Sequence, residues 1–262
     1  MDLKSIVQTG VKIDPPRILL HGIHKVGKST FGAHAPSPIF LQTEDGLTGI
    51  DVPRFPIANS LDDVWQYMGL LINEDHQYST FVIDTIDWLE KLIWDQVCKE
   101  KGVKNIKDIG WNKGYDFAMN HWYRLKKGLD ILHKQKGMAI LILAHNEVKP
   151  INPPDSESYD RYQIKLEKKA MALLSEWVDC ILFAREITYV NNKKAVSSGE
   201  RVIQTNSNPA WAAGTRYNIP DQIQLEFGEL LKHIKNEKKR AEISAGEYEG
   251  TEDETKTTKT GE

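Results

Sequence analysis

One short run of residues, Gly22–Ser29, constrains the fold more than any other feature of this sequence. It follows the pattern G-x-x-x-x-G-K-[ST], comes directly after the apolar segment Arg17–His21, and leads into a helical pattern that starts at Ser29. Glycines allow the backbone to turn tightly, so that successive N–H groups point toward phosphate oxygens. The positive end of the following helix favours the same ligand. A strand, this loop and a helix in succession therefore predict a nucleotide-binding site.

The residues of this loop have distinct predicted roles. Lys28 is expected to reach the β- and γ-phosphates of ATP, and the Ser29 hydroxyl is expected to ligate Mg²⁺. ATP and Mg²⁺ are therefore the predicted ligands. The residues predicted to bind the nucleotide are Gly22, His24, Lys25, Val26, Gly27, Lys28, Ser29 and Thr30.

Short apolar runs alternate with longer helical patterns, which is typical of an α/β fold with a mostly parallel sheet flanked by helices. The apolar runs in the middle of this series are nearly continuous, as expected of strands that are covered on both faces. The predicted strands are Arg17–His21, Pro38–Gln42, Thr80–Asp84, Met138–Ala144 and Val178–Ala184. The predicted helices run from an N-cap at Ser60 to about Asn73, over Ile86–Glu100, and over Tyr115–Lys136.

The pattern changes after Ala184. The segments Ile187–Val190 and Ala195–Thr205, on either side of a turn at Asn191 and Asn192, predict a C-terminal antiparallel hairpin extension. A last helix is expected over about Asp221–Lys235.

Polar side chains end three of the predicted parallel strands. Asp84 ends an apolar strand and is expected to hold the hydration shell of Mg²⁺, with Asp87 as the alternative acid. Glu44 comes just after another strand, where a carboxylate can orient or deprotonate the attacking water. The alternative is that Glu44 only begins a turn. His145 and Asn146 follow a third strand, and one of them is expected to contact the γ-phosphate. The alternative is that both are polar loop residues with no such role.

The net charge of the chain, −3, is unevenly distributed. Residues 241–262 contain seven acids and two lysines and almost no large apolar side chain, which predicts a disordered acidic tail. Residues 1–240 then carry a net charge of +2, so the total charge does not exclude a nucleic-acid partner. We expect an N-terminal extension over 1–14, one ATPase domain over 15–240 and the tail over 241–262.

Other classes of protein are disfavoured by what the sequence lacks. No apolar run approaches the ~18–20 residues that span a bilayer, and the N-terminus has no signal-peptide pattern. The two cysteines, Cys98 and Cys180, are too few for a disulfide scaffold or a zinc site. We therefore expect a cytoplasmic protein with no membrane partner.

The order of these parts resembles the RecA-like ATPase core, in which the catalytic glutamate lies on the strand after the phosphate-loop helix. AAA+ proteins instead carry two acids together on one strand, and Asp84-Thr85 does not provide that pair. More narrowly, the chain is similar to phage RecA-like proteins of the Sak-type single-strand annealing family, over roughly residues 15–225. The residues that carry this resemblance are Gly22–Ser29, Leu41–Gly46, Phe81–Asp84, Leu143–His145, Trp177–Asp179 and Trp211–Pro220.

This resemblance implies an ATPase that binds single-stranded DNA and promotes annealing and recombination in phage DNA metabolism, in the cytoplasm of a bacterial host. DNA contacts in RecA-like filaments come from loops after the aspartate strand and after the sensor strand. Lysines would neutralise phosphates there and aromatic rings would stack on bases. The implied DNA-binding residues are Lys101, Lys104, Lys107, Trp111 and Lys113 in the first loop and Lys149 and Arg161 in the second. The alternative for Trp111 is that it caps a hydrophobic core. The stretch Glu147–Lys169 is expected to be a mobile loop.

The resemblance also implies assembly into a ring or filament of identical subunits. The segment Gly214–Tyr217 is similar to the Lys-Asn-Arg-Phe signature of RadA-type relatives, whose basic residues reach a neighbouring nucleotide. Arg216 matches that pattern, whereas Gly214 replaces the lysine. Arg216 is thus expected to act on a neighbouring subunit's nucleotide, or else to pair with an acid at the surface. A single-strand-binding protein is a further candidate partner.

Two other functions fit a phosphate loop. One is a phosphotransferase acting on a small molecule, which would need a lid with several arginines, and Asp155–Lys169 has only Arg161. The other is a nucleotide-gated interaction module with little turnover, in which Glu44 is not catalytic.

Overall fold

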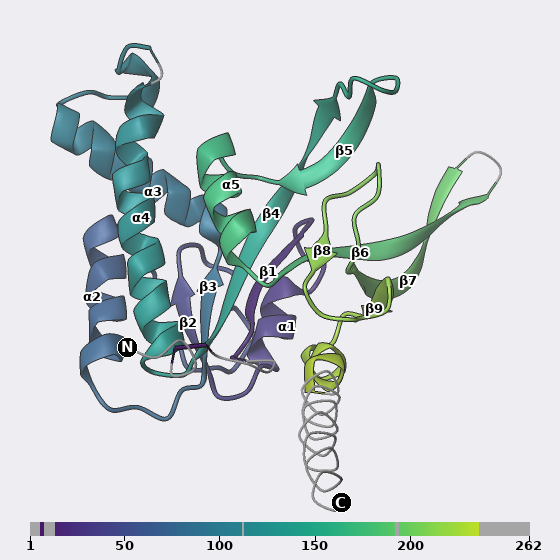
Figure 1. Ribbon diagram of the computed structural model, residues 1–262, viewed down its shortest axis with the longest axis horizontal. Coiled ribbons are helices and arrows are strands. Elements are labelled where there is room, and N and C mark those ends of the chain that lie inside the picture. Colours follow the sequence, from purple (N-terminus) through teal and green to yellow (C-terminus); the bar gives the residue numbers. More distant parts are fainter. Residues whose placement is uncertain (1–5, 8–13, 112, 192–193, 236–262) are drawn as a thin grey trace, which may run out of the picture.

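One mixed sheet forms the centre of the protein in the computed structural model, which describes residues 6–7, 14–111, 113–191 and 194–235 (Figure 1). Along its main path the strand order is β2-β3-β4-β1-β6-β7-β9, with β5 paired to β4 and β8 to β6. The strands β2, β3, β4, β1 and β6 run parallel, which confirms the predicted α/β class. Their bounds are β1 Arg17–Gly22, β2 Pro38–Gln42, β3 Thr80–Asp84, β4 Ala139–Ile151 and β6 Cys180–Asn191.

Helices cover both faces of this sheet, as the continuous apolar runs predict (Figure 1). Alternate residues of β3 point to opposite faces, so Phe81 and Ile83 join one apolar cluster and Val82 joins the other. The first cluster is closed by the helices α2 (Leu61–Asn73), α3 (Ile86–Lys101), α4 (Lys113–Lys134) and α5 (Lys168–Trp177). The second is closed by α1 (Lys28–Ala33) and by the helical residues 227–235.

The sequence signals at helix ends correspond to observed caps. The Ser60 hydroxyl accepts from the Asp63 N–H, and the Asp63 carboxylate accepts from the Ser60 N–H, which starts α2 at the predicted residue. Gly102 caps the end of α3 in a left-handed conformation (φ 65°), and the last helical residue, Lys101, is one residue beyond the predicted end. The predicted inward stripe of α3, with Leu89 and Ile93, is fully buried.

The expected mobile loop over Glu147–Lys169 is wrong. Strand β4 continues well past its predicted end and returns antiparallel as β5 (Tyr159–Ile164), and α5 follows. Because this ribbon projects from the body of the protein, its side chains beyond His145 are at least partly exposed except for Ile164, and its strand pattern lacks a continuous apolar run (Figure 1). Lys149 and Arg161 lie opposite each other in its register.

The predicted antiparallel extension is present, and one part of it differs from expectation. Strand β6 pairs with β7 (Lys194–Gln204) and with the short β8 (Gly214–Thr215). The helix expected from Asp221 starts later, because β9 (Gln222–Gln224) first pairs with β7. Phe227, at the start of that helix, contacts Phe31 of α1 with ring centroids 5.1 Å apart. The extension is thereby packed against the phosphate-loop helix.

The predicted acidic tail lies outside the described residues, as does most of the predicted N-terminal extension. Within the described part of the chain, no helix has the length and apolar character that crossing a membrane requires.

A buried glutamate on α3 makes the stability of the fold depend on pH. Both carboxylate oxygens of Glu90 lie 3.1–3.2 Å from the Glu167 N–H at the start of α5. Burial, followed by repulsion from Glu167 and Asp87, raises the pKa of Glu90 to about 8. The folded protein thus retains a proton that the unfolded chain releases near its ordinary pKa. The resulting stabilisation is complete below that ordinary value and is lost as the pH rises toward 8.

We expect Glu90→Gln to remove this dependence, because the amide mimics the protonated acid and can still accept the Glu167 N–H bond. Relative to this variant, the wild type should lose on the order of 1–3 kcal/mol of unfolding free energy between about pH 5 and about pH 8. Urea unfolding at several pH values measures the difference. Glu226→Gln, at an exposed position, is the matched control. Parallel pH profiles for wild type and Glu90→Gln would contradict the assignment.

Candidate active site

The phosphate loop joins the end of β1 to the start of α1, as predicted, and glycines shape it at two points. A Cβ on Gly22 would lie 2.5 Å from the Ala184 carbonyl oxygen of β6, so only glycine fits where the loop leaves the sheet. Gly27 has φ 111°, a left-handed conformation that side chains rarely adopt. The loop residues between them, from Ile23 to Lys25, are exposed.

Lys28 is buried directly behind the loop. Its Nζ donates to the carbonyl oxygens of Gly22 and Ile23, at 3.0 and 2.9 Å, which leaves one of its three protons for a phosphate oxygen. Burial lowers the pKa of Lys28, and the charges of Asp84 and Asp87 oppose that shift. The ammonium group is therefore held in place, close to acids that balance its charge.

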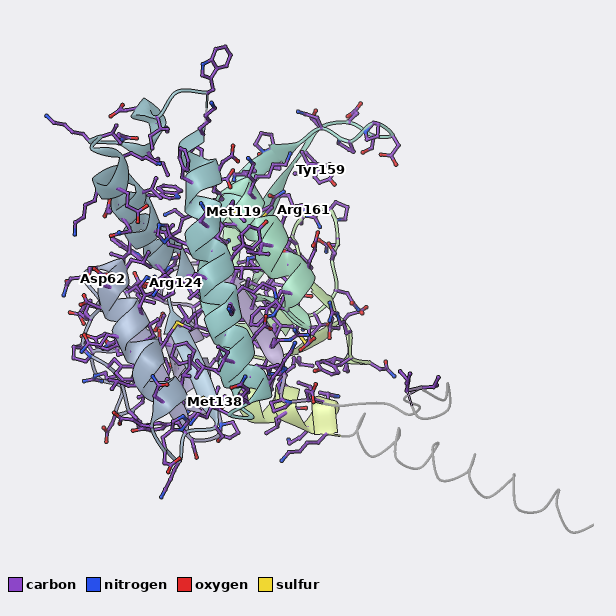
Figure 2. All side chains as sticks on the ribbon, turned by 60° about the vertical axis from the view of Figure 1, so that its left-hand side comes forward. Asp62, Met119, Arg124, Met138, Tyr159 and Arg161 are labelled. Carbon is purple, nitrogen blue, oxygen red and sulfur yellow. The ribbon has the colours of Figure 1, made fainter. Side chains whose placement is uncertain are left out.

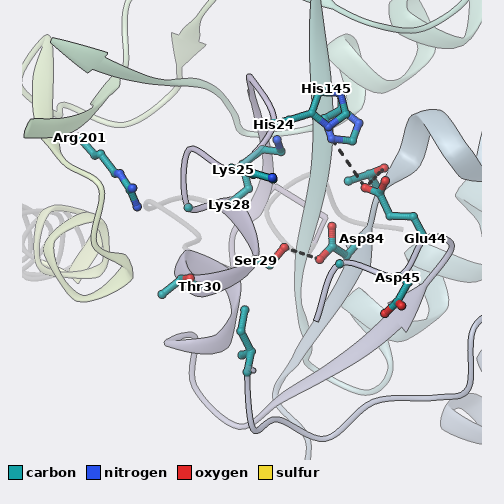
Figure 3. Close-up of a pocket in the computed structure, with 14 residues that line it drawn as sticks. His24, Lys25, Lys28, Ser29, Thr30, Glu44, Asp45, Asp84, His145 and Arg201 are labelled. Atoms are coloured by element: carbon teal, nitrogen blue, oxygen red, sulfur yellow. Dashed lines mark hydrogen bonds and ion pairs between the residues drawn. The ribbon is translucent and has the colours of Figure 1, made fainter. Parts of the chain in front are cut away.

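Ser29 and Asp84 form the predicted metal-binding pair. The Ser29 hydroxyl donates to Asp84 Oδ2 at 2.7 Å, across the space between α1 and the end of β3 (Figure 3). Burial, with repulsion from Glu44, raises the pKa of Asp84 to about 6. Hydroxyl and carboxylate oxygens are ligands that Mg²⁺ prefers, and this ion commonly completes its shell with waters and phosphate oxygens. No cluster of three or more acidic, histidine or cysteine ligands occurs among the described residues. The pair thus fits a metal that arrives with a nucleotide.

Glu44 is held over the same site by a clamp of two threonines. Thr43 Oγ1 accepts from the Thr85 N–H at 3.0 Å and donates to the Thr85 carbonyl at 2.6 Å, which ties the ends of β2 and β3 together. The Thr85 hydroxyl then donates to Glu44 Oε1 at 3.0 Å. The Glu44 side chain is 22% exposed, so it remains open to solvent on one side. Glu44 also begins a turn, since its carbonyl accepts from the Gly46 N–H at 3.0 Å, and its carboxylate lies in the wall of the same cavity as the phosphate loop.

His145 is positioned by Asp87, the acid that the sequence ranked second to Asp84. Asp87 accepts from the His145 backbone N–H and lies 3.0 Å from its Nδ1. Burial would raise the pKa of Asp87, but these two bonds lower it below its usual range. The other ring nitrogen, Nε2, is 3.7 Å from Glu44, and His24 of the loop stacks on the ring at 3.8 Å between centroids. Asp87 is thus a partner of His145.

These side chains line one cavity of about 380 Å³ at the carboxyl edge of the parallel strands (Figure 3). His145 contributes to its wall, whereas Asn146 does not. Of the predicted nucleotide-binding residues, Gly22 and the buried Val26 shape the loop from behind. The lining residues are His24, Lys25, Gly27, Lys28, Ser29, Thr30, Glu44, Asp45, Gly46, Ile50, Asp84, Thr85, His145 and Arg201. No local sequence pattern marks Thr85 or Arg201 as a residue of this cavity.

Arg216 lies at the opposite edge of the sheet from this cavity. Its guanidinium pairs with Asp179 at 3.1 Å and donates to the Glu176 carbonyl at 2.9 Å. Asp179 also binds Arg17, where β1 begins, so this cluster joins the amino ends of the strands. Arg216 therefore takes no part in the nucleotide site of its own chain, and its side chain remains 58% exposed.

The first predicted DNA-binding segment forms the tip between α3 and α4. Trp111 is 95% exposed and has φ 60°, so it does not cap a hydrophobic core. The lysines around it are also exposed, and the Lys101 ammonium lies 3.7 Å from the centroid of the Phe117 ring. The exposed lysines are Lys101, Lys104, Lys107 and Lys113.

The second predicted DNA-binding segment is the β4–β5 ribbon, where both basic residues have protein partners. Lys149 pairs with Glu147 at 2.8 Å. Arg161, which is labelled with Tyr159 in Figure 2, donates to the Ser207 hydroxyl and to the Trp211 carbonyl, and these bonds tie the ribbon to residues 207–211. The ribbon and the α3–α4 tip project from the same end of the protein (Figure 1).

Known proteins resemble this chain to different degrees. The SPbeta prophage-derived uncharacterized protein YorG of Bacillus subtilis (strain 168) is 22% identical over 229 residues, which is 85% of this chain. The chain spans 65% of the length of that relative. The crystal structure of the RadB recombinase aligns with 12% identity and a TM-score of 0.44, over 72% of this chain and 80% of that chain.

A family model described as AAA domain matches residues 14–217, which include the phosphate loop, Glu44, Asp84 and His145. Glu44 follows β2 and Asp84 ends β3, so these two acids do not stand together on one strand, and the Thr43–Thr85 clamp joins the ends of the two strands. The match covers most of the chain, and the phosphate loop has the geometry that its sequence predicts. The chain therefore belongs to this AAA domain family of P-loop proteins.

Proposed function

We propose that this protein is a RecA-like ATPase that binds single-stranded DNA and promotes strand annealing in phage DNA metabolism. The observation that carries the ATPase assignment is Glu44, which Thr85 holds at the mouth of the phosphate loop beside His145. The Sak-type sequence resemblance and the prophage-derived relative support the phage setting.

The side chains at the phosphate-loop end of the cavity have distinct roles in this proposal. Glu44 accepts a proton from the attacking water or orients it, because the Thr85 hydroxyl fixes its carboxylate. Lys28 donates its remaining proton to a phosphate oxygen. His145 faces the γ-phosphate through Nε2, since Asp87 holds Nδ1. Mg²⁺, held by Ser29 with Asp84, would neutralise phosphate charge when bound.

The α3–α4 tip supports the DNA part of the proposal. An aromatic residue in a left-handed conformation is strained, and such strain persists where function uses it. An indole that is 95% exposed, with four exposed lysines within ten residues of it along the chain, offers a ring for base stacking and charges for phosphates. This combination needs no particular base sequence, which suits annealing.

The exposed Arg216 supports assembly of subunits. An arginine that acts on a nucleotide from a neighbouring chain must lie away from the site of its own chain, as Arg216 does. It would exchange its pairing with Asp179 for a phosphate contact when subunits meet.

Stimulation of ATP hydrolysis by single-stranded DNA separates this function from the two alternatives. We expect the steady-state rate with Mg²⁺ to rise when single-stranded DNA is added, and to rise less with duplex DNA. A phosphotransferase or a gated interaction module has no reason to respond to the strand. A rate that single strands leave unchanged would exclude the proposed function.

Glu44→Gln should abolish turnover while sparing nucleotide binding. The amide cannot take the proton, so kcat should fall roughly 10²- to 10⁴-fold, and the Kd for ATP should stay close to that of the wild type. Single-turnover hydrolysis and equilibrium binding measure the two effects. Asp51→Asn is the control, because Asp51 is a nearby exposed acid outside the cavity wall. Retained turnover would remove the role of Glu44 as the base.

Replacing Trp111 and two neighbouring lysines tests the DNA surface. Trp111→Ala should weaken single-strand binding by about 1–3 kcal/mol through lost stacking. Adding Lys104→Ala and Lys107→Ala should reduce the slope of log K against log salt by about 0.7 for each lysine. Fluorescence anisotropy over a salt series measures both quantities.

The matched control for this surface is Trp88→Ala with Lys91→Ala. Trp88 is 39% exposed on α3, and the Lys91 ammonium lies 3.4 Å from the centroid of its ring. This pair has the same chemistry at another place on the surface. Equal effects of both sets of substitutions, or no effect of the Trp111 set, would place the DNA elsewhere.

A further inference from the structure

Arg201 enters the nucleotide cavity from the C-terminal extension, far from the phosphate loop in sequence. It lies on β7, opposite Glu186 in the register with β6, and lines the cavity together with residues of the loop (Figure 3). Its Nη1 is 3.5 Å from the point that a Cβ on Gly27 would occupy. The guanidinium thus lies against the left-handed turn of the loop.

The backbone at Arg201 is fixed by the same extension. The Arg201 carbonyl accepts from the Leu225 N–H at 3.1 Å, and Leu225 Cδ2 is 3.3 Å from the same point at Gly27. Phe227 contacts Phe31 of α1 two residues further along. Because the extension is packed on the loop and its helix, the backbone of Arg201 is held beside the cavity, and its exposed side chain lines the cavity wall.

The side chain of Arg201 differs from those of the other described arginines. Each of the others makes a hydrogen bond, an ion pair or a ring contact within the described part of the chain, whereas the Arg201 guanidinium makes none. Five donors in a fixed planar arrangement, placed against a phosphate loop, match the oxygens of a phosphate group.

The position of Arg201 indicates which part of a nucleotide it would contact. Glu44, Asp84 and His145 gather at one end of the cavity, where the γ-phosphate and the metal are expected, and Arg201 lies across the loop from them (Figure 3). Gly27 is next to Arg201. In this position the guanidinium would face the α- and β-phosphates of a nucleotide bound with its γ-phosphate beside Glu44 and His145.

We infer that Arg201 is a nucleotide-binding residue supplied in cis by the C-terminal extension, and that it contacts the phosphates shared by ADP and ATP. This inference rests on the proposed nucleotide site. The two arginines then have different roles: Arg201 binds the nucleotide of its own chain, whereas Arg216 would contact only the nucleotide of a neighbouring chain.

The test compares Arg201→Gln and Arg201→Lys with Arg185→Gln. Arg185 is the matched control, since it lies on the neighbouring strand β6 and its guanidinium faces the Trp211 ring at 5.1 Å. Binding of ADP and ATP with Mg²⁺ is measured with a fluorescent nucleotide, and single-turnover hydrolysis is measured at saturating ATP. Thermal unfolding of each variant checks that the fold is retained.

We expect Arg201→Gln to raise the Kd for ADP and for ATP by a similar factor, roughly 10- to 100-fold, as for the loss of a charged hydrogen bond. The single-turnover rate at saturation should stay within about threefold of the wild type, because Arg201 does not face the γ-phosphate. Arg201→Lys should recover part of the affinity, since lysine keeps the charge but loses the planar donors.

Two results would overturn the inference. One is an unchanged Kd for ADP in Arg201→Gln. The other is a lower single-turnover rate with intact ADP binding, which would place Arg201 at the γ-phosphate. The ADP measurement needs neither DNA nor turnover. A wild type that binds ADP but fails to respond to single strands would therefore refute the proposed function while leaving the test of Arg201 valid.

Discussion

The register of the central strand β1 determines where the chemistry of this protein can occur. Parallel pairing sets Gly22 opposite His145 on one side and opposite Ala184 on the other. The same alignment, carried outward through β4 and β3, brings Asp84 and the residues after Gln42 to one edge. A shift by a single residue would turn the side chains of a strand to the other face. The apolar clusters on both faces therefore hold the polar strand ends in line at the cavity.

Hydrogen bonds between strand ends then convert this alignment into a defined site. The Thr43–Thr85 clamp compensates for placing the two acids on separate strands, because it joins the segments that carry Glu44 and Asp84. Asp87 commits its carboxylate to His145 and thereby leaves Asp84 as the acid that faces Ser29. Buried polar groups of this kind require partners, and each of these side chains supplies a partner to another. The geometry of the acid site consequently depends on all of these side chains together.

Sequence patterns predicted the central part of the fold because burial on both faces leaves a clear signature. Continuous apolar runs located the five parallel strands, and the glycine spacing located the phosphate loop. The β4–β5 ribbon carries no such signature, since few of its side chains are buried and Pro150 within it suggests a loop. The sequence does not indicate the role of Asp87 either, because a carboxylate just past a strand end can face either a metal or a histidine. Only the placement of His145 decides between the two.

The sequence does not predict that Arg201 lies in the cavity, because its position depends on the topology of the chain. Its segment alternates like any half-exposed strand, and nothing local distinguishes it from Arg185 on β6. What brings it to the loop is the return of β7 along β6 and the packing of residues 225–235 on α1, both of which are long-range contacts. A charged side chain on an edge hairpin is ordinarily a solubility device. Here Arg201 of the hairpin lines the cavity beside the phosphate loop, so the contact inferred for it would make the antiparallel extension a functional part of the P-loop core that precedes it.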